Sequence, residues 1–272
     1  MQDSLAAMQP QTKQRLLALA RSLQLLPLME HVRFQRTKKH NAAENAAFLD
    51  AHPDFTAPPL WWMHDMYRHT SYAQYWRTGQ ETAAKLSAKI DQHLDVRTPR
   101  VADWGCGLSR VLRHLPDHYE RTGFDYNTKA IGWCKENIAN VSFHQNGVRP
   151  PLDAHANAFD ALYALSVFTH LSAQGHDAWI AEIERVLAPG GIFLGAFHMQ
   201  LPQGQLLPGE QRKFDAGELV VRGGVKEGSR IYTAHHPETY LRNHLLKNFD
   251  LVEPPLALFK QTLFIARRKS EG

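Results

Sequence analysis

The sequence has little cysteine, no long hydrophobic run and no strong excess of one charge. Its 272 residues include two cysteines, Cys106 and Cys134, in no metal-binding spacing. We therefore expect free thiols in a reducing compartment, and hence a cytoplasmic protein. No apolar run approaches the roughly 20 residues of a membrane span, and no signal-peptide pattern opens the chain. The formal net charge of +4 is too small to indicate nucleic-acid binding by itself.

The stretch Val101–Arg110 combines a short apolar run with a glycine-spaced turn. The run ends in Asp103, Gly105 and Gly107 follow, and a helical pattern begins at Val111. A strand, a glycine-rich turn and a helix N-terminus in this order form a corner that binds nucleotide-type ligands. Short glycine-spaced strings also occur in ordinary loops, so a strand-to-helix turn without a ligand is the alternative.

Two further features limit which ligands this corner can bind. Dinucleotide-binding turns carry a third glycine where this chain has Arg110, and the Gly-Lys-Ser/Thr string of a P-loop is absent. A second strand-like run, Arg121–Phe124, ends in Asp125, 22 residues after Asp103. A carboxylate at that place accepts the hydroxyl protons of a ribose. The ligand therefore carries a ribose and need not carry a pyrophosphate, and S-adenosylmethionine fits that description.

These residues resemble motif I of class I S-adenosylmethionine-dependent methyltransferases, with Ser109 where the family usually has glycine. Three later segments resemble further motifs in the family's order: Gly123–Asn127, Phe159–Leu171 and Leu187–Gly191. The resemblance covers about residues 55–268 and is strongest to a bacterial subgroup that modifies glycans and other small molecules. It implies an enzyme with S-adenosyl-L-methionine as its cofactor.

The expected fold class is α/β, a Rossmann-like sheet of seven mostly parallel strands with a helical N-terminal cap. Strand and helix patterns alternate from Arg100 onward, which is typical of a parallel sheet covered by helices. We predict strands at 100–104, 121–124, 141–144, 159–164, 192–197, 249–253 and 262–267. Residues 1–98 are predicted to form a helical N-terminal region and lid, and residues 99–272 the methyltransferase domain, with an insertion at about 199–234 on the acceptor side.

The N-terminal region carries a leucine stripe and a basic patch. The stripe has helical spacing and consists of Leu16, Leu19, Leu23 and Leu26. The patch consists of Arg33, Arg36, Lys38 and Lys39. It forms either a solvated helical face or a contact with an anionic membrane or a lipid-linked acceptor.

The residues that the resemblance assigns to the cofactor lie at the carboxyl ends of the first four strands. They are Asp103, Gly105, Cys106 and Gly107 after the first strand, Asp125 and Tyr126 after the second, Asn146 and Gly147 after the third, and Leu165 and Ser166 after the fourth. Tyr72, in an aromatic segment before the motif, is a further candidate because aromatic faces attract a sulfonium. The alternative for that segment is a hydrophobic lid packed on the sheet.

Three histidines are candidates for the catalytic base, in the order His170, His236, His198. A hydroxyl acceptor must lose its proton, and an imidazole with a pKa near 6.5 suits that work at neutral pH. An ordinary structural role is the alternative for each. We predict no metal site, because the carboxylates that would hold one are scattered: Asp153, Asp160 and Asp177.

The leading prediction is an S-adenosylmethionine-dependent methyltransferase acting on an oxygen, or secondarily a nitrogen, of a small molecule or sugar. A non-catalytic module that binds S-adenosylmethionine or S-adenosylhomocysteine and acts through protein interaction is the alternative. Nucleic-acid methylation is disfavoured, because residues 164–167 lack the Asn/Asp-Pro-Pro-Tyr/Phe string of the base-modifying enzymes. The predicted partner is therefore a small-molecule or glycan acceptor.

Overall fold

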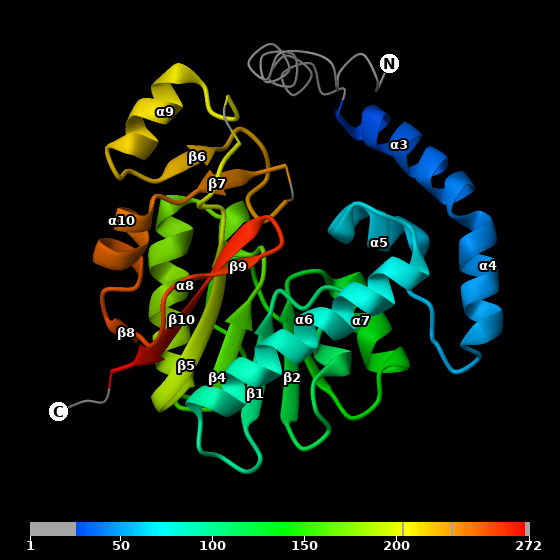
Figure 1. The fold of residues 1–272 in the computed structure, drawn as a ribbon, viewed down its shortest axis with the longest axis horizontal. Helices are drawn as coiled ribbons and strands as arrows, with labels where there is room; N and C mark the ends of the chain where they lie inside the picture. The colour runs from blue at the N-terminus through cyan, green and yellow to red at the C-terminus, as the bar shows by residue number, and fades with distance from the viewer. Residues whose placement is uncertain (1–25, 203, 230, 270–272) are drawn as a thin grey trace.

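The computed structural model describes residues 26–202, 204–229 and 231–269, and its centre is a mixed sheet between two layers of helices (Figure 1). The strand order is β3-β2-β1-β4-β5-β10-β8, and β9 pairs with β10 at one side. The strands are β1 Arg100–Trp104, β2 Glu120–Asp125, β3 Ser142–Gln145, β4 Phe159–Ala164, β5 Leu187–Phe197, β8 Phe249–Leu251, β9 Leu256–Leu258 and β10 Gln261–Arg268. β1 to β5 are parallel, and β10 runs antiparallel to its neighbours. The predicted class I methyltransferase fold is confirmed.

The main difference among the predicted strands concerns β5, which begins at Leu187 rather than at 192. Leu187 pairs with Phe159, and the register with β4 then shifts before Ala161 pairs with Ile192. Gly190 supplies the positive φ of 75° within that irregularity, which is typical of a β-bulge. The Pro189-Gly190-Gly191 string is therefore built into the strand.

Alternating side chains of the central strands form two separate cores, one on each face of the sheet. Val101 and Tyr163 belong to the core under α6 (Tyr72–His93) and α7 (Thr128–Asn137). Ala102 and Leu162 belong to the core under α8 (Ala173–Val186). Asn127 caps α7, because its side chain accepts hydrogen bonds from the amides of Lys129 and Ala130.

The helix expected from Val111 does not form, and this corrects the prediction. Residues 105–111 are turns and loop, and only the 3₁₀ helix Leu112–His114 follows. Ser109 has a left-handed φ of 60°, and Pro116 stops any helix shortly afterwards. α6 lies directly against this segment: a Cβ added to Gly79 would stand 2.1 Å from the carbonyl oxygen of Arg110.

Among the described residues, three helices precede α6 and wrap one side of the molecule: α3 Leu26–His40, α4 Ala42–Ala51 and α5 Leu60–Tyr67 (Figure 1). An aromatic and apolar cluster that includes Phe55, Met63 and Tyr75 joins them to α6. Most of the predicted leucine stripe lies outside the described residues. In the basic patch Arg33 pairs with Glu30, and Arg36, Lys38 and Lys39 are exposed.

The predicted insertion contains α9 (Pro208–Asp215) and the hairpin-like pair β6 (Val220–Arg222) and β7 (Thr233–His235). α10 (Glu238–Tyr240) and the π-helical turn Leu241–Leu245 then lead back to the sheet. No helix among the described residues is long and apolar enough to cross a bilayer.

The left-handed backbone conformation of Ser109 predicts that glycine at this position would stabilise the protein. An L-residue in this conformation costs about 1 kcal/mol relative to glycine, and the buried Ser109 hydroxyl has no hydrogen-bond partner among the described residues. We expect Ser109→Gly to raise the free energy of unfolding by about 1 kcal/mol in urea titrations. Ser109→Ala removes the hydroxyl but keeps the Cβ, and an equal gain in that control would show that the backbone is not responsible.

Candidate functional site

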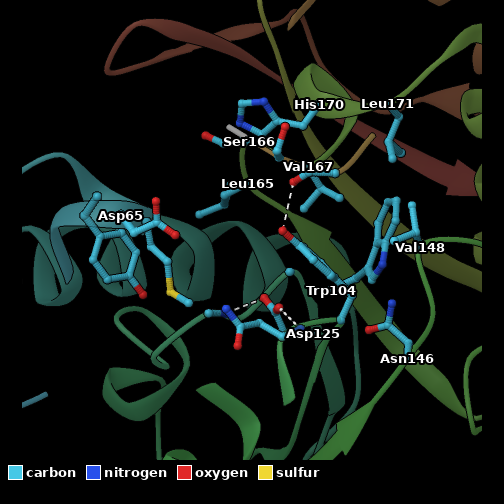
Figure 2. Close-up of a pocket in the computed structure, with 18 of the residues that line it drawn as sticks. Asp65, Trp104, Asp125, Asn146, Val148, Leu165, Ser166, Val167, His170 and Leu171 are labelled. Atoms are coloured by element: carbon cyan, nitrogen blue, oxygen red, sulfur yellow. Dashed lines mark hydrogen bonds between the residues drawn. The ribbon is translucent and has the colours of Figure 1, made fainter. Parts of the chain in front are cut away.

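A cavity of about 490 Å³ opens at the carboxyl ends of β1, β2, β3 and β4. Figure 2 shows Trp104, Asp125, Asn146, Ser166 and His170 around it. The sheet forms one wall, α5 a second, and the segment after Lys226 a third. Of the residues assigned to the cofactor from sequence, the lining contains Gly105, Gly107, Asp125, Tyr126, Asn146, Gly147, Leu165 and Ser166.

The glycine loop is held against the end of β2 by its own backbone. The amides of Gly105 and Cys106 both donate to the carbonyl oxygen of Phe124, at 2.8 and 3.0 Å. Gly105 has a φ of 85°, and a Cβ there would lie 2.3 Å from a methyl carbon of Val167. Backbone conformation and close packing both therefore require glycine at position 105.

Asp125 connects the glycine loop with the start of α7. Its Oδ2 accepts a hydrogen bond from the amide of Gly107 at 2.9 Å, and its Oδ1 accepts one from Asn127 at 2.8 Å. Burial raises the pKa of this carboxyl, and the backbone N–H donors oppose that rise because they stabilise the anion. A carboxylate fixed this way at a cavity wall is suited to accept hydroxyl protons from a ribose.

Asn146 offers a hydrogen-bond acceptor beside Asp125. Its amide nitrogen Nδ2 donates to the carbonyl of Gly147 at 2.6 Å, which leaves Oδ1 buried without a partner among the described residues. Buried polar atoms are nearly always satisfied in native proteins, so an orphaned acceptor in a cavity wall indicates a ligand with a donor. The amino group of adenine is such a donor. These residues fit an adenosine ligand.

Asp103 and Cys106 lie behind the loop and do not line the cavity. Burial and the nearby charge of Asp125 raise the pKa of Asp103 to about 8, against a lowering effect of the Tyr163 hydroxyl. Burial also raises the pKa of the Cys106 thiol, whose side chain belongs to the core under α6. Neither of these two side chains is therefore placed to contact a ligand in the cavity.

Tyr72 is also placed away from the cavity, in the N-terminal cluster with its ring edge-on to Phe55. The neighbouring helix α5 supplies the aromatic wall instead, through Trp61 and Tyr67. Of the aromatic segment singled out in the sequence, the part that lines the cavity is therefore α5 and not the start of α6. Asp65 and Met66 line the cavity from the same helix.

His170 is the predicted base that lines the cavity. It ends the 3₁₀ helix Phe168–His170, which follows β4. Its Nδ1 lies 2.7 Å from the carbonyl oxygen of Tyr232, which can only accept a hydrogen bond. Nδ1 therefore carries the proton in the neutral ring, and Nε2 carries the lone pair that a general base needs.

His236 and His198 are separated from the cavity. The Nε2 atoms of His236 and His176 lie 2.8 Å apart in a fully buried pair, and burial holds the pKa of His236 well below its usual range. The His198 ring stacks on His235, and burial lowers the pKa of His198 to about 4. These histidines form a cluster between β5, β7 and α8 in which His176, His235 and His236 are buried and His198 is half-buried. Position after a strand therefore did not distinguish a cavity residue from a packed one.

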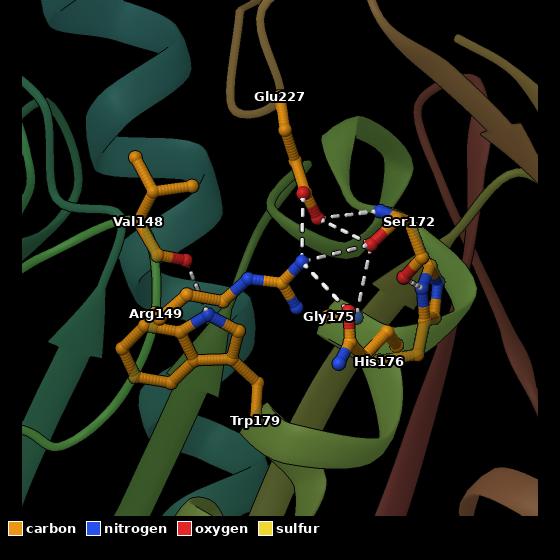
Figure 3. Close-up of polar contacts among 8 residues, drawn as sticks. Val148, Arg149, Ser172, Gly175, His176, Trp179 and Glu227 are labelled. Carbon is orange, nitrogen blue, oxygen red and sulfur yellow. Dashed lines mark hydrogen bonds and ion pairs between the residues drawn. The ribbon is translucent and has the colours of Figure 1, made fainter.

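The cover loop, which we define as residues 226–229 and 231–232, lies across the cavity from α5. Gly228 binds both sides: its amide donates to the carbonyl of His170 at 2.9 Å, and its carbonyl accepts from the Tyr126 hydroxyl at 3.1 Å. Glu227 accepts hydrogen bonds from the amide and hydroxyl of Ser172, each at 2.7 Å, and pairs with Arg149 at 3.1 Å (Figure 3). No local sequence pattern predicts these contacts, because they join segments far apart in the chain.

Comparison with known proteins supports the assignment of the domain. Residues 101–191 match the family model described as Methyltransferase domain. The chain is 37% identical over 109 residues to a fatty-acid O-methyltransferase of Mycolicibacterium smegmatis, a match that spans 37% of each chain. The chain thus aligns with little more than a third of the length of that curated relative.

Solved structures with the same fold are more distant in sequence. An S-adenosylmethionine-dependent methyltransferase from Methanosarcina mazei has a TM-score of 0.52 at 19% identity, covering 67% of this chain and 98% of its own. The S-adenosylmethionine-bound amino pentose methyltransferase CalS10 from Micromonospora echinaspora has a TM-score of 0.51 at 17% identity, covering 73% and 96%. At these identities the likeness concerns the fold alone.

The raised pKa of Asp103 predicts a stability that falls with rising pH. Its pKa of about 8 in the folded protein lies above the ordinary value of about 3.9, so between these values the folded state holds a proton that the unfolded state releases. Asp103→Asn cannot ionise. The free energy of unfolding of the variant minus that of wild type should therefore be more than about 1.4 kcal/mol higher at pH 9 than at pH 5.

Denaturant unfolding of both proteins at the two pH values measures this difference. Asp117→Asn serves as the control, because the Asp117 side chain is 96% exposed. A gap between Asp103→Asn and wild type that stays constant with pH would contradict the buried-carboxyl account.

Proposed function

We propose, from the methyltransferase domain at residues 101–191, that this protein is an S-adenosylmethionine-dependent methyltransferase that methylates an oxygen atom of a small molecule or sugar. The observation that carries the proposal is the cavity: Asp125 and Asn146 on one wall fit an adenosine, and His170 on another presents a base. A site that only bound a nucleoside would have no need of a base such as His170.

The residues that would hold the cofactor follow from their chemistry. Asp125 would accept from the ribose hydroxyls, and the unpartnered Oδ1 of Asn146 would accept from the adenine amino group. The carbonyls after β4, at Leu165 and Ser166, are suited to the methionine ammonium. When bound, S-adenosylmethionine supplies a methyl group already activated by a positively charged sulfur.

The acceptor would lie between α5 and the cover loop. The walls there are largely apolar, with Trp61 and Met66 on one side and Ile231 on the other. Such walls exclude water and hold an apolar body, while a few polar groups fix its orientation. The likeness to a fatty-acid O-methyltransferase supports an acceptor that combines an apolar body with a reactive oxygen.

His170 would take the proton from an acceptor hydroxyl at Nε2. The carbonyl of Tyr232 keeps Nδ1 protonated and fixes the ring, so the base needs no rearrangement before it acts. The carbonyl of His170 also accepts from Gly228, which ties the base to the cover loop. The contact that holds the cover loop in place therefore also helps to hold the base.

Asp125→Asn tests the cofactor half of the proposal. The variant keeps the side-chain shape but loses the anion, so we expect S-adenosylhomocysteine affinity to fall at least about 10-fold, the value of one charge-assisted hydrogen bond. Isothermal titration calorimetry measures it, with Asp117→Asn as the exposed matched control. Wild-type protein that is folded yet binds no S-adenosylhomocysteine would refute the function outright.

His170→Gln tests the catalytic half. We expect methyl transfer to fall about 100-fold or more, because a positioned base contributes that much, while S-adenosylhomocysteine affinity stays within about twofold. The assay follows transfer from labelled S-adenosylmethionine to a panel of hydroxylated lipids, fatty acids and sugars. His118→Gln, at an exposed position, is the control. Undiminished turnover in His170→Gln would remove this residue from the mechanism, and binding without turnover on any acceptor would favour the non-catalytic alternative.

A further inference from the structure

Among the described residues that line the cavity, Arg110 is the only one whose side chain has a permanent positive charge. The carboxylates of the same lining are Glu30, Asp65 and Asp125. A lone guanidinium in a cavity whose other charged groups are mainly acidic is a specific place for an anionic group of a ligand. Neither the adenosine contacts nor the proposed base makes use of it.

The local fold explains why a side chain is needed there. In most strand–glycine loop–helix corners, the N-terminus of the following helix binds the anionic part of the ligand through its free amides and dipole. In residues 105–119, all of which the structure describes, the only helix is the three-residue 3₁₀ segment Leu112–His114. That corner therefore lacks the usual helical source of positive potential, and Arg110 stands at the place where it would begin.

The guanidinium of Arg110 is held in position rather than left to solvent. It lies over the ring of Tyr67, 5.3 Å from the ring centre, and its Nη1 donates to the hydroxyl of Thr78 at 3.2 Å. Gly79 packs on the backbone carbonyl of the same residue. Contacts from both α5 and α6 thus orient a group that carries five N–H donors, of which Thr78 receives one.

We propose that Arg110 binds the carboxylate of the methionine part of S-adenosylmethionine, an assignment that rests on the proposed function. Asp125 fixes the ribose beside Gly107, so the amino-acid part of the cofactor must extend past the end of β1. Arg110 lies on that side, close enough to Asp103 to lower its pKa. Because the loop that cradles the cofactor also carries this residue, we assign the carboxylate to the cofactor rather than to the acceptor.

The test compares two ligands that differ in the carboxylate alone. S-adenosylhomocysteine carries it, and S-adenosyl-3-thiopropylamine keeps the adenosine, thioether and ammonium but lacks it. Calorimetry without any acceptor should show that wild type prefers S-adenosylhomocysteine. Arg110→Met should weaken S-adenosylhomocysteine at least about 10-fold and leave the decarboxylated ligand within about twofold. Arg110→Lys should recover part of the loss because it restores the charge.

Arg77→Met is the matched control, since Arg77 lies on α6 outside the cavity and its side chain is 64% exposed. It should match wild type with both ligands. Binding of the decarboxylated ligand shows that Arg110→Met is folded, so misfolding cannot imitate the result.

Three outcomes would overturn the assignment. Equal weakening of both ligands would mean that Arg110 supports the loop and does not read the carboxylate. Unchanged affinity for S-adenosylhomocysteine, with reduced methylation of carboxylic acceptors, would place Arg110 on the acceptor. If wild type itself binds neither ligand, the proposed function fails together with this assignment, whereas the first two outcomes leave that function intact.

Discussion

The hydrogen bonds of the Asp125 carboxylate hold the site together. One oxygen takes the amide of Gly107 and the other the amide of Asn127, so a single side chain at the end of β2 fixes both the glycine loop and the first turn of α7. The carboxylate is buried, and its burial is offset by these N–H donors. The conformation of the loop that carries Arg110 depends on this connection, and so does the ribose position in the proposed complex.

Two walls of the cavity are formed by segments outside the sheet, and we call this part the upper half of the cavity. α5 brings an aromatic wall from the N-terminal side, and the cover loop brings the opposite wall from the insertion. Gly228 is hydrogen-bonded both to Tyr126, on the side proposed for the cofactor, and to His170, on the side proposed for the acceptor. The two halves of the site are therefore mechanically connected, which suits an enzyme that must assemble a nucleoside, an acceptor and a base away from water.

The rest of the cavity, its lower half, is formed by the ends of the sheet strands, and much of it could be predicted from local sequence. The spacing from Asp103 to Asp125 follows from the length of a strand, a connection and a second strand, and the alternating patterns placed the strands of the sheet. The rule that ligands bind at the carboxyl ends of parallel strands predicted Asn146 and Ser166, and both residues line the cavity. The rule did not distinguish His170 from His198, because both follow a strand. Which of them faces the cavity depends on how β7 and α8 pack around β5.

The sequence by itself determined the sheet, the glycine loop and the acids that follow its strands, because these depend on residues within one or two elements of each other. Only the tertiary structure decided that Tyr72 is packed in a core, that α5 faces the cavity, and that a helix is missing after the loop. Those outcomes depend on contacts across long separations, such as the 102 residues between Tyr126 and Gly228. No local pattern encodes them, because burial at these positions is decided by what the rest of the chain places on top.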